Sequence, residues 1–111
     1  MEIRAHYAIQ KLHTWEALYA AYRKYLPCDD GAIAEGFADA VGTLLADRWG
    51  WLPRGAKLME RDASFRAFVV RRHLGEITPQ IQWVEIVENA SKHCPVQYKT
   101  ICDEILRAND G

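Results

Sequence analysis

The chain has 111 residues, of which half are apolar and about a quarter are charged. This length and composition fit one globular domain with its own hydrophobic core, and they exclude an extended disordered chain. Lysine and arginine number 14 against 15 for aspartate and glutamate, so the formal net charge is -1. No overall positive field therefore draws the protein to nucleic acid or to an anionic membrane.

The sequence also bears on the compartment. Its apolar runs are only a few residues long, whereas a helix that crosses a bilayer needs roughly 20. The first residues, MEIRAHYAIQKLH, place an acid at position 2 and scatter charges, so they lack the basic start and apolar stretch of a secretory signal. Three cysteines, an odd number, are typical of reduced thiols. We therefore expect a cytoplasmic protein without membrane contact.

Glycine and proline divide the chain into segments whose apolar residues recur with the period of an α-helix. No internal repeat or linker interrupts them. We expect an all-α protein in which residues 1–111 form a single domain of about five helices, packed as an irregular bundle. The expected helices cover residues 5–26, 30–49, 62–74, 79–93 and 95–108.

The first of these helices has a rival interpretation. One amphipathic helix explains residues 5–26, and we prefer it. Apolar residues also alternate between positions 3 and 9, which is typical of a short strand. Thr14 would then cap a shorter helix that starts at Trp15.

Other boundaries follow from capping residues. Asp62 is placed to cap the third helix, and Thr78 followed by proline marks the start of the fourth. The stretch GWLPRGAKLMER, residues 50–61, is read as irregular because glycine and proline interrupt it. Pro95 has no amide hydrogen and fits the first turn of the fifth helix.

The second helix carries small residues spaced four, four and three apart: Ala32, Gly36, Ala40 and Thr43. A glycine inside a helix costs on the order of 1 kcal/mol relative to alanine, so Gly36 indicates that something packs close to this backbone. A neighbouring helix of the same chain is the simpler partner. A second copy of the protein, giving a homodimer, is the sharper alternative.

Two cysteines and a histidine lie together in SKHCPVQYKTIC, residues 91–102. If Pro95 opens a helix, Cys94 and Cys102 lie roughly 12 Å apart along its axis and cannot form a disulfide without unwinding it. The stretch has neither a CxxC motif nor the closely spaced ligand pairs of a structural zinc site. Cys102 is expected in the core, and we expect no metal or cofactor. A small thiol- or metal-dependent protein centred on His93 and Cys94 is a minor alternative.

The first alternative function, a nucleic-acid-associated regulator, comes from the segment RDASFRAFVVRRH. It carries five basic side chains: Arg61, Arg66, Arg71, Arg72 and His73. A basic helix over residues 61–73 followed by a glycine turn is reminiscent of a helix-turn-helix regulator of nucleic acid. The next helix, however, would present Glu85, Glu88 and Asn89 outward, and its acids would repel phosphate. Arginines paired with acids of neighbouring helices explain the segment better, so nucleic acid is not the expected partner.

Trp49 and Trp51 flank Gly50 in a turn-rich connection that leads to Arg54. Aromatic and arginine side chains on loops are the usual anchors of protein interfaces, so these three residues are the preferred place for a partner to bind. An equal alternative is that both tryptophans fold back and cover the core as a lid.

Enzyme motifs are missing: there is no glycine-rich phosphate loop, no GxSxG and no HExxH. Catalytic groups from distant segments could still meet, so this lowers the expectation of an enzyme without removing it. We expect a non-enzymatic module that binds another protein. In size and helical class it resembles small bacterial immunity and antitoxin proteins, an analogy without a shared motif.

Overall fold

The computed structural model of the chain describes residues 12–25, 31–73 and 80–110. Within them it has helices and no strand, so the expected all-α class is confirmed. The six α-helices are α2 (Trp15–Tyr25), α3 (Gly31–Ala46), α4 (Leu52–Arg61), α5 (Ala63–Ala67), α6 (Gln80–Lys92) and α7 (Lys99–Asp110). Three short helical segments join them: the 3-10 turns η2 (Trp49–Trp51) and η4 (Val96–Tyr98), and the π-helical η3 (Phe68–His73).

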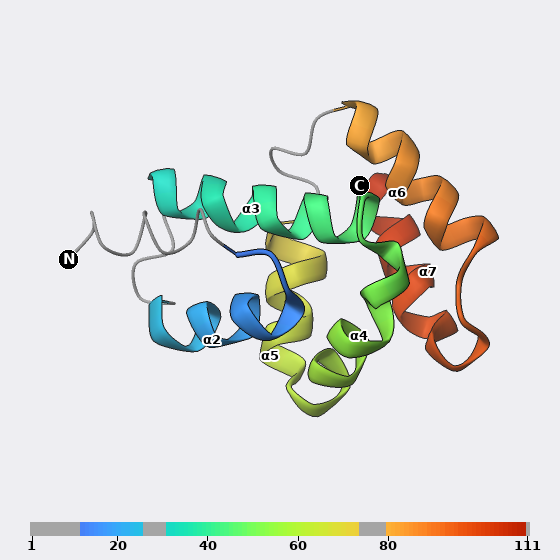
Figure 1. Cartoon of the computed structure of the whole chain (residues 1–111). Helices are drawn as coiled ribbons and strands as arrows, with labels where there is room; N and C mark the ends of the chain where they lie inside the picture. The colour runs from blue at the N-terminus through green and yellow to red at the C-terminus, as the bar shows by residue number, and fades with distance from the viewer. Residues whose placement is uncertain (1–11, 26–30, 74–79, 111) are drawn as a thin grey trace.

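The helices form one globule around α3. In Figure 1, α3 runs across the molecule, with α2, α4 and α5 on one side of it and α6 and α7 at its right-hand end. Helix α3 packs on α6, which packs on α7, while α4 contacts α2 and α5.

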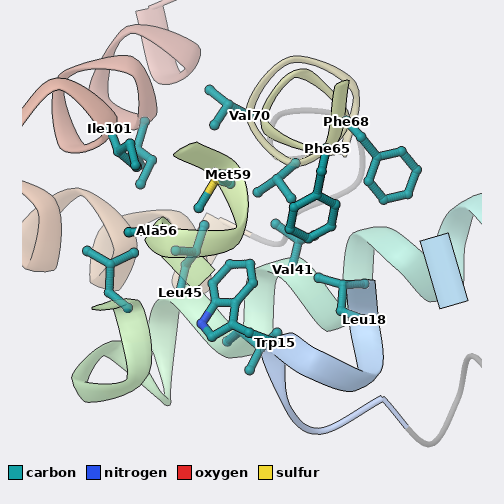
Figure 2. Packing of buried hydrophobic residues seen from close by; sticks show 14 of the residues in the cluster. Trp15, Leu18, Val41, Leu45, Ala56, Met59, Phe65, Phe68, Val70 and Ile101 are labelled. Atoms are coloured by element: carbon teal, nitrogen blue, oxygen red, sulfur yellow. The ribbon is translucent and has the colours of Figure 1, made fainter. Parts of the chain in front are cut away.

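Every α-helix contributes to a single hydrophobic core (Figure 2). The core residues that are less than 2 % exposed include Trp15, Phe37, Met59, Phe65, Ile86 and Ile101, one or more from each helix. Fully burying a large apolar side chain stabilises the fold by about 1.5–3 kcal/mol. The shared core therefore stabilises helices most of which, at 5 to 13 residues, are marginal in water on their own.

Helix α2 begins later than the preferred prediction. Residues 12–14 are not helical, so a continuous helix over 5–26 is wrong there. The amide of Ala17 donates to Thr14 Oγ1 at 3.1 Å, which makes Thr14 the N-cap of a helix that starts at Trp15. The shorter helix of the rival interpretation is confirmed. Its strand, at residues 3–9, lies outside the described residues.

The prediction that residues 50–61 are irregular is wrong, because most of them form α4. Pro53 stands in the first turn, where its missing amide hydrogen costs nothing. Gly55 is buried, and a Cβ on it would overlap the indole ring of Trp15. The glycine therefore marks a close approach of α2 to α4 rather than a break in the helix.

Asp62 caps α5 as predicted: the amide of Phe65 donates to its Oδ1 at 3.1 Å. The other carboxylate oxygen accepts a hydrogen bond from the Tyr19 hydroxyl at 2.9 Å. One side chain thus starts α5 and ties it to α2. The predicted helix over 62–74 continues beyond α5 as η3, with a wider π-helical turn from Phe68 to His73.

Asn89 was expected to point outward from the fourth predicted helix, and this is wrong. Its side-chain amide donates to the carbonyl oxygens of Leu45 at 3.0 Å and Ala46 at 3.2 Å. These carbonyls close the C-terminal end of α3 and have no partner within their own helix. Asn89 therefore caps α3 from α6.

The predicted helix over 95–108 begins too early. Pro95 is extended, with φ -62° and ψ 137°, η4 follows it, and α7 starts only at Lys99. The chain therefore turns between Cys94 and Cys102 instead of rising along one axis. Their Cα atoms are 6.3 Å apart and the two residues form a disulfide, so the prediction that they cannot pair is wrong. Cys102 does lie in the core, as expected.

Candidate interaction surface

The turn η2 separates its two tryptophans. Trp49 is half-buried against the core, and its indole N–H donates to the carbonyl oxygen of His93 at 3.0 Å. Trp51 is 36 % exposed, so its ring faces solvent. Trp49 therefore folds back onto the protein, whereas Trp51 is partly exposed. The role of these residues in binding a partner stays a prediction.

Trp51 is held in place although it is exposed. The guanidinium of Arg48 lies 5.2 Å from the centroid of the Trp51 ring. Such a cation–π contact contributes about 0.5–1 kcal/mol at an exposed site. The hydrogen bond of Trp49 fixes the same three-residue turn from the other side. The exposed indole therefore has a contact with Arg48 and stands on a turn that is tied to the carbonyl of His93.

Arg54 lies on the exposed face of α4. Lys57 and Arg61 follow it at spacings of three and four residues, and both are exposed. These spacings place the three cations in one row on the helix. The opposite side of α4 is buried and consists of Leu52, Gly55, Ala56 and Met59. The sequence analysis identifies Arg54 but not its row with Lys57 and Arg61, because it predicts an irregular segment at residues 50–61.

Arg54, Lys57 and Arg61 form no ion pair with any residue in the described part of the chain. Arg66 on α5 behaves differently, because its Nη2 lies 2.6 Å from Glu104 Oε1 on α7. The three cations of α4 are exposed and form no ion pair within the described ranges. We call these three residues together with Trp51 the tryptophan–basic face.

The basic helix expected over residues 61–73 does not form one basic surface among the described side chains. Arg61 ends α4, whereas Arg66 belongs to α5 and is paired with Glu104. The side chains of Arg71, Arg72 and His73 lie outside the description. For Arg66, the interpretation as a structural arginine paired across helices fits.

The small-residue strip of α3 is not a continuous open surface. Ala40 is only 6 % exposed and belongs to the core of its own chain. Gly36 is half-buried, Thr43 is exposed, and the side chain of Ala32 is outside the description. Helix α3 packs on α6 of the same chain, and whether the strip also meets a second copy stays a prediction.

The cysteine stretch forms no metal centre in the described residues. No group of three or more histidine, cysteine, aspartate or glutamate side chains in the described ranges could hold a metal ion. The sulfurs of Cys94 and Cys102 are joined to each other, and His93 is exposed. The third cysteine, Cys28, lies outside the described residues.

The titrating groups with shifted pKa values lie between α2 and α5, not on the tryptophan–basic face. The hydrogen bond from Tyr19 lowers the pKa of Asp62, and the amide of Phe65 lowers it further. Burial raises the pKa of the neighbouring Tyr22. These shifts belong to a packing contact, since Tyr22 is in the core and Asp62 is a helix cap.

No protein-family model, no curated protein and no solved structure matches this chain. None of the described helices has the length and apolar character needed to cross a membrane. The class that the structure defines is an all-α bundle, with an exposed tryptophan beside a row of cations that form no ion pair with the described residues.

Proposed function

We propose that the protein is a protein-binding domain and that Trp51 anchors its interface. The observation that supports this is an indole 36 % exposed yet held by Arg48 on one side and by its own turn on the other. Tryptophan and arginine are the residues that most often dominate binding energy at protein interfaces. A side chain ordered in advance also loses less conformational entropy on binding.

The test is quantitative affinity capture from the native cells with the wild type and with Trp51→Ala. We expect the partner's apparent affinity to fall by at least tenfold, because truncating an anchor residue costs about 2 kcal/mol or more. Val84→Ala is the matched control, since Val84 is an exposed apolar residue on α6 at 59 % exposure. Recovery of the same partners at the same affinity with Trp51→Ala would reject the proposal.

The proposed location is the cytoplasm, on the basis of the odd number of cysteines, which is typical of reduced thiols. The Cys94–Cys102 disulfide stands against it, because disulfides are rare in that compartment. Rapid acid quenching and alkylation of cells, followed by mass spectrometry, measures the state of this pair directly. A largely reduced pair supports the cytoplasm, and a fully oxidised pair points to an oxidising compartment.

A further inference from the structure

We propose that the partner presents an acidic segment, which lies along the cations of α4 and places one apolar side chain against Trp51. This inference rests on the proposed protein-binding function and specifies the chemistry of the partner. It starts from the uneven distribution of charge along the chain.

Residues 48–61 hold four of the 14 basic residues and only one of the 15 acidic residues, so this segment carries a net +3 in a chain of net -1. The basic residues are Arg48, Arg54, Lys57 and Arg61, and the acid is Glu60. A local net positive charge therefore lies on the segment that also presents Trp51. Complementary charge at an interface guides association and selects the partner.

The geometry sets the size of the partner segment. Arg61 follows Arg54 by seven positions, which corresponds to about 10 Å along the helix axis. An extended peptide covers that length with about three residues. Trp51 precedes Arg54 by three residues and lies at the same end of α4. A short segment with two or three acids next to one large apolar residue therefore matches the tryptophan–basic face. In Figure 1, α4 lies at the lower edge of the molecule, away from α6.

The pairing is favourable because none of these three cations forms an ion pair with a described acid. The guanidinium groups of Arg54 and Arg61 can each bind a carboxylate through two parallel hydrogen bonds. An exposed ion pair contributes little affinity because water screens it, so the apolar contact with Trp51 must supply much of the affinity. The charged part of the affinity should weaken with salt.

Nucleic acid is the competing ligand, because phosphates also bind rows of cations beside an aromatic ring. The rest of the chain, however, holds ten basic and 14 acidic residues and so carries a net -4. A long polyanion would meet repulsion beyond the short basic row, whereas a short acidic segment would not. The charge distribution therefore favours an acidic protein segment.

The experiment is an NMR titration of the ¹⁵N-labelled full chain with a synthetic peptide of aspartate and glutamate around one leucine. We expect the indole N–H of Trp51 and the amides of α4 to shift, with a dissociation constant below about 1 mM at low salt. Arg54→Gln/Lys57→Gln should weaken binding by roughly fivefold. The matched control is Lys92→Gln/Lys99→Gln, which removes two exposed cations on other helices.

Three results would overturn the acidic-segment proposal. They are the absence of any shift at peptide concentrations up to about 1 mM, equal weakening of peptide binding in the control variant, and tighter binding of an oligothymidine to the same residues. Failure of the two proposals can be told apart. If Trp51→Ala loses the native partner while Arg54→Gln/Lys57→Gln keeps it at full affinity, the protein-binding function stands and the acidic segment is rejected. If Trp51→Ala also keeps the partner, the interface itself is rejected.

Discussion

At the scale of single residues, Gly55 decides how closely two helices approach. The ring of Trp15 lies against its backbone, at the place a side chain would otherwise occupy. Trp15 is 1 % exposed and is among the largest fully buried side chains of the described core. The indole N–H of Trp15 finds no acceptor among the described residues. The ring is therefore held by its packing alone, and its fit against Gly55 matters.

We predict that Gly55→Ala destabilises the protein although alanine favours helices. The helix propensity of alanine offers up to about 1 kcal/mol, whereas overpacking a core typically costs about 1–3 kcal/mol. Urea unfolding should show a net loss of stability. Gly50→Ala is the matched control, because no atom lies within 4 Å of a Cβ built at Gly50 and it should be neutral or slightly stabilising. Identical unfolding midpoints for the two variants would contradict the packing argument.

Asp62 makes stability depend on acid pH. Its pKa is lowered in the folded protein, mainly by the Tyr19 hydrogen bond, so the folded state holds this proton less tightly than the unfolded state. The stabilisation is fully present above the unfolded pKa of about 4 and is lost as pH falls through the lower folded pKa.

We predict that the unfolding free energy declines below about pH 4 and that Asp62→Asn makes the decline shallower. Asparagine keeps the oxygen that caps α5, its amide nitrogen can donate to the Tyr19 hydroxyl oxygen in place of the lost acceptor, and it does not titrate. The pH dependence attributable to this group should therefore disappear. Urea unfolding at neutral and acid pH measures the effect. Glu85→Gln, on the exposed side of α6, serves as the reference. A slope unchanged by Asp62→Asn alone would be the contrary result.

At the scale of elements, the sequence predicts helix caps made by residues nearby in the chain. It does not predict caps or packing contacts made by residues of another helix. Thr14 and Asp62 cap helices through amides only three residues away, and both caps could be read from the sequence. Asn89 instead caps the end of α3, far away in the chain, and helical period alone placed it outward. Gly55 looked like a helix break because its reason, the ring of Trp15, lies in another helix.

The same limit applies to the end of the chain. Proline is common at the first position of a helix, and Pro95 was assigned there. In the structure Pro95 is extended, with ψ 137°, so the chain turns after Cys94 and this residue lies close to Cys102 on α7. The candidate site was affected as well: Trp51 and Arg54 could be named from residue type, but Lys57 and Arg61 joined them only once α4 was known to be a helix.

We predict that reducing the Cys94–Cys102 disulfide lowers stability by about 2–3 kcal/mol. The bond closes a short loop, with a sequence separation of 8, and so restricts the unfolded chain. Urea unfolding with and without a phosphine reductant measures the difference. Cys94→Ser should unfold like the reduced wild type under both conditions, whereas Cys28→Ser should retain the response to reductant. Alkylation of both cysteines in the unreduced native protein would show that the bond is absent.

At the scale of the whole molecule, the shared core couples the helices. The rings of Phe65 and Phe68 both contact the ring of Tyr22 on α2. Phe37 on α3 contacts Phe68. The Arg66–Glu104 pair connects α5 with α7, and Asn89 connects α6 with α3. No described group of helices has a core of its own, since the buried residues form one cluster.

We predict that the protein unfolds in one cooperative transition. Tryptophan fluorescence reports mainly on the buried or half-buried rings of Trp15, Trp49 and Trp83, while far-UV circular dichroism reports on all helices. The two urea transitions should coincide in midpoint and slope. A fluorescence change that precedes the loss of helix would mean that part of the bundle unfolds separately.

The disulfide also has a topological consequence. Together with the backbone from Cys94 to Cys102 it closes a covalent ring, and the exposed Lys99 lies within this ring at the start of α7. A protease that cuts after Lys99 would open the ring without releasing anything, because the fragment that begins at Thr100 stays bound through Cys102. Helix α7 therefore has two independent covalent attachments to the rest of the protein, and both must be broken to detach it.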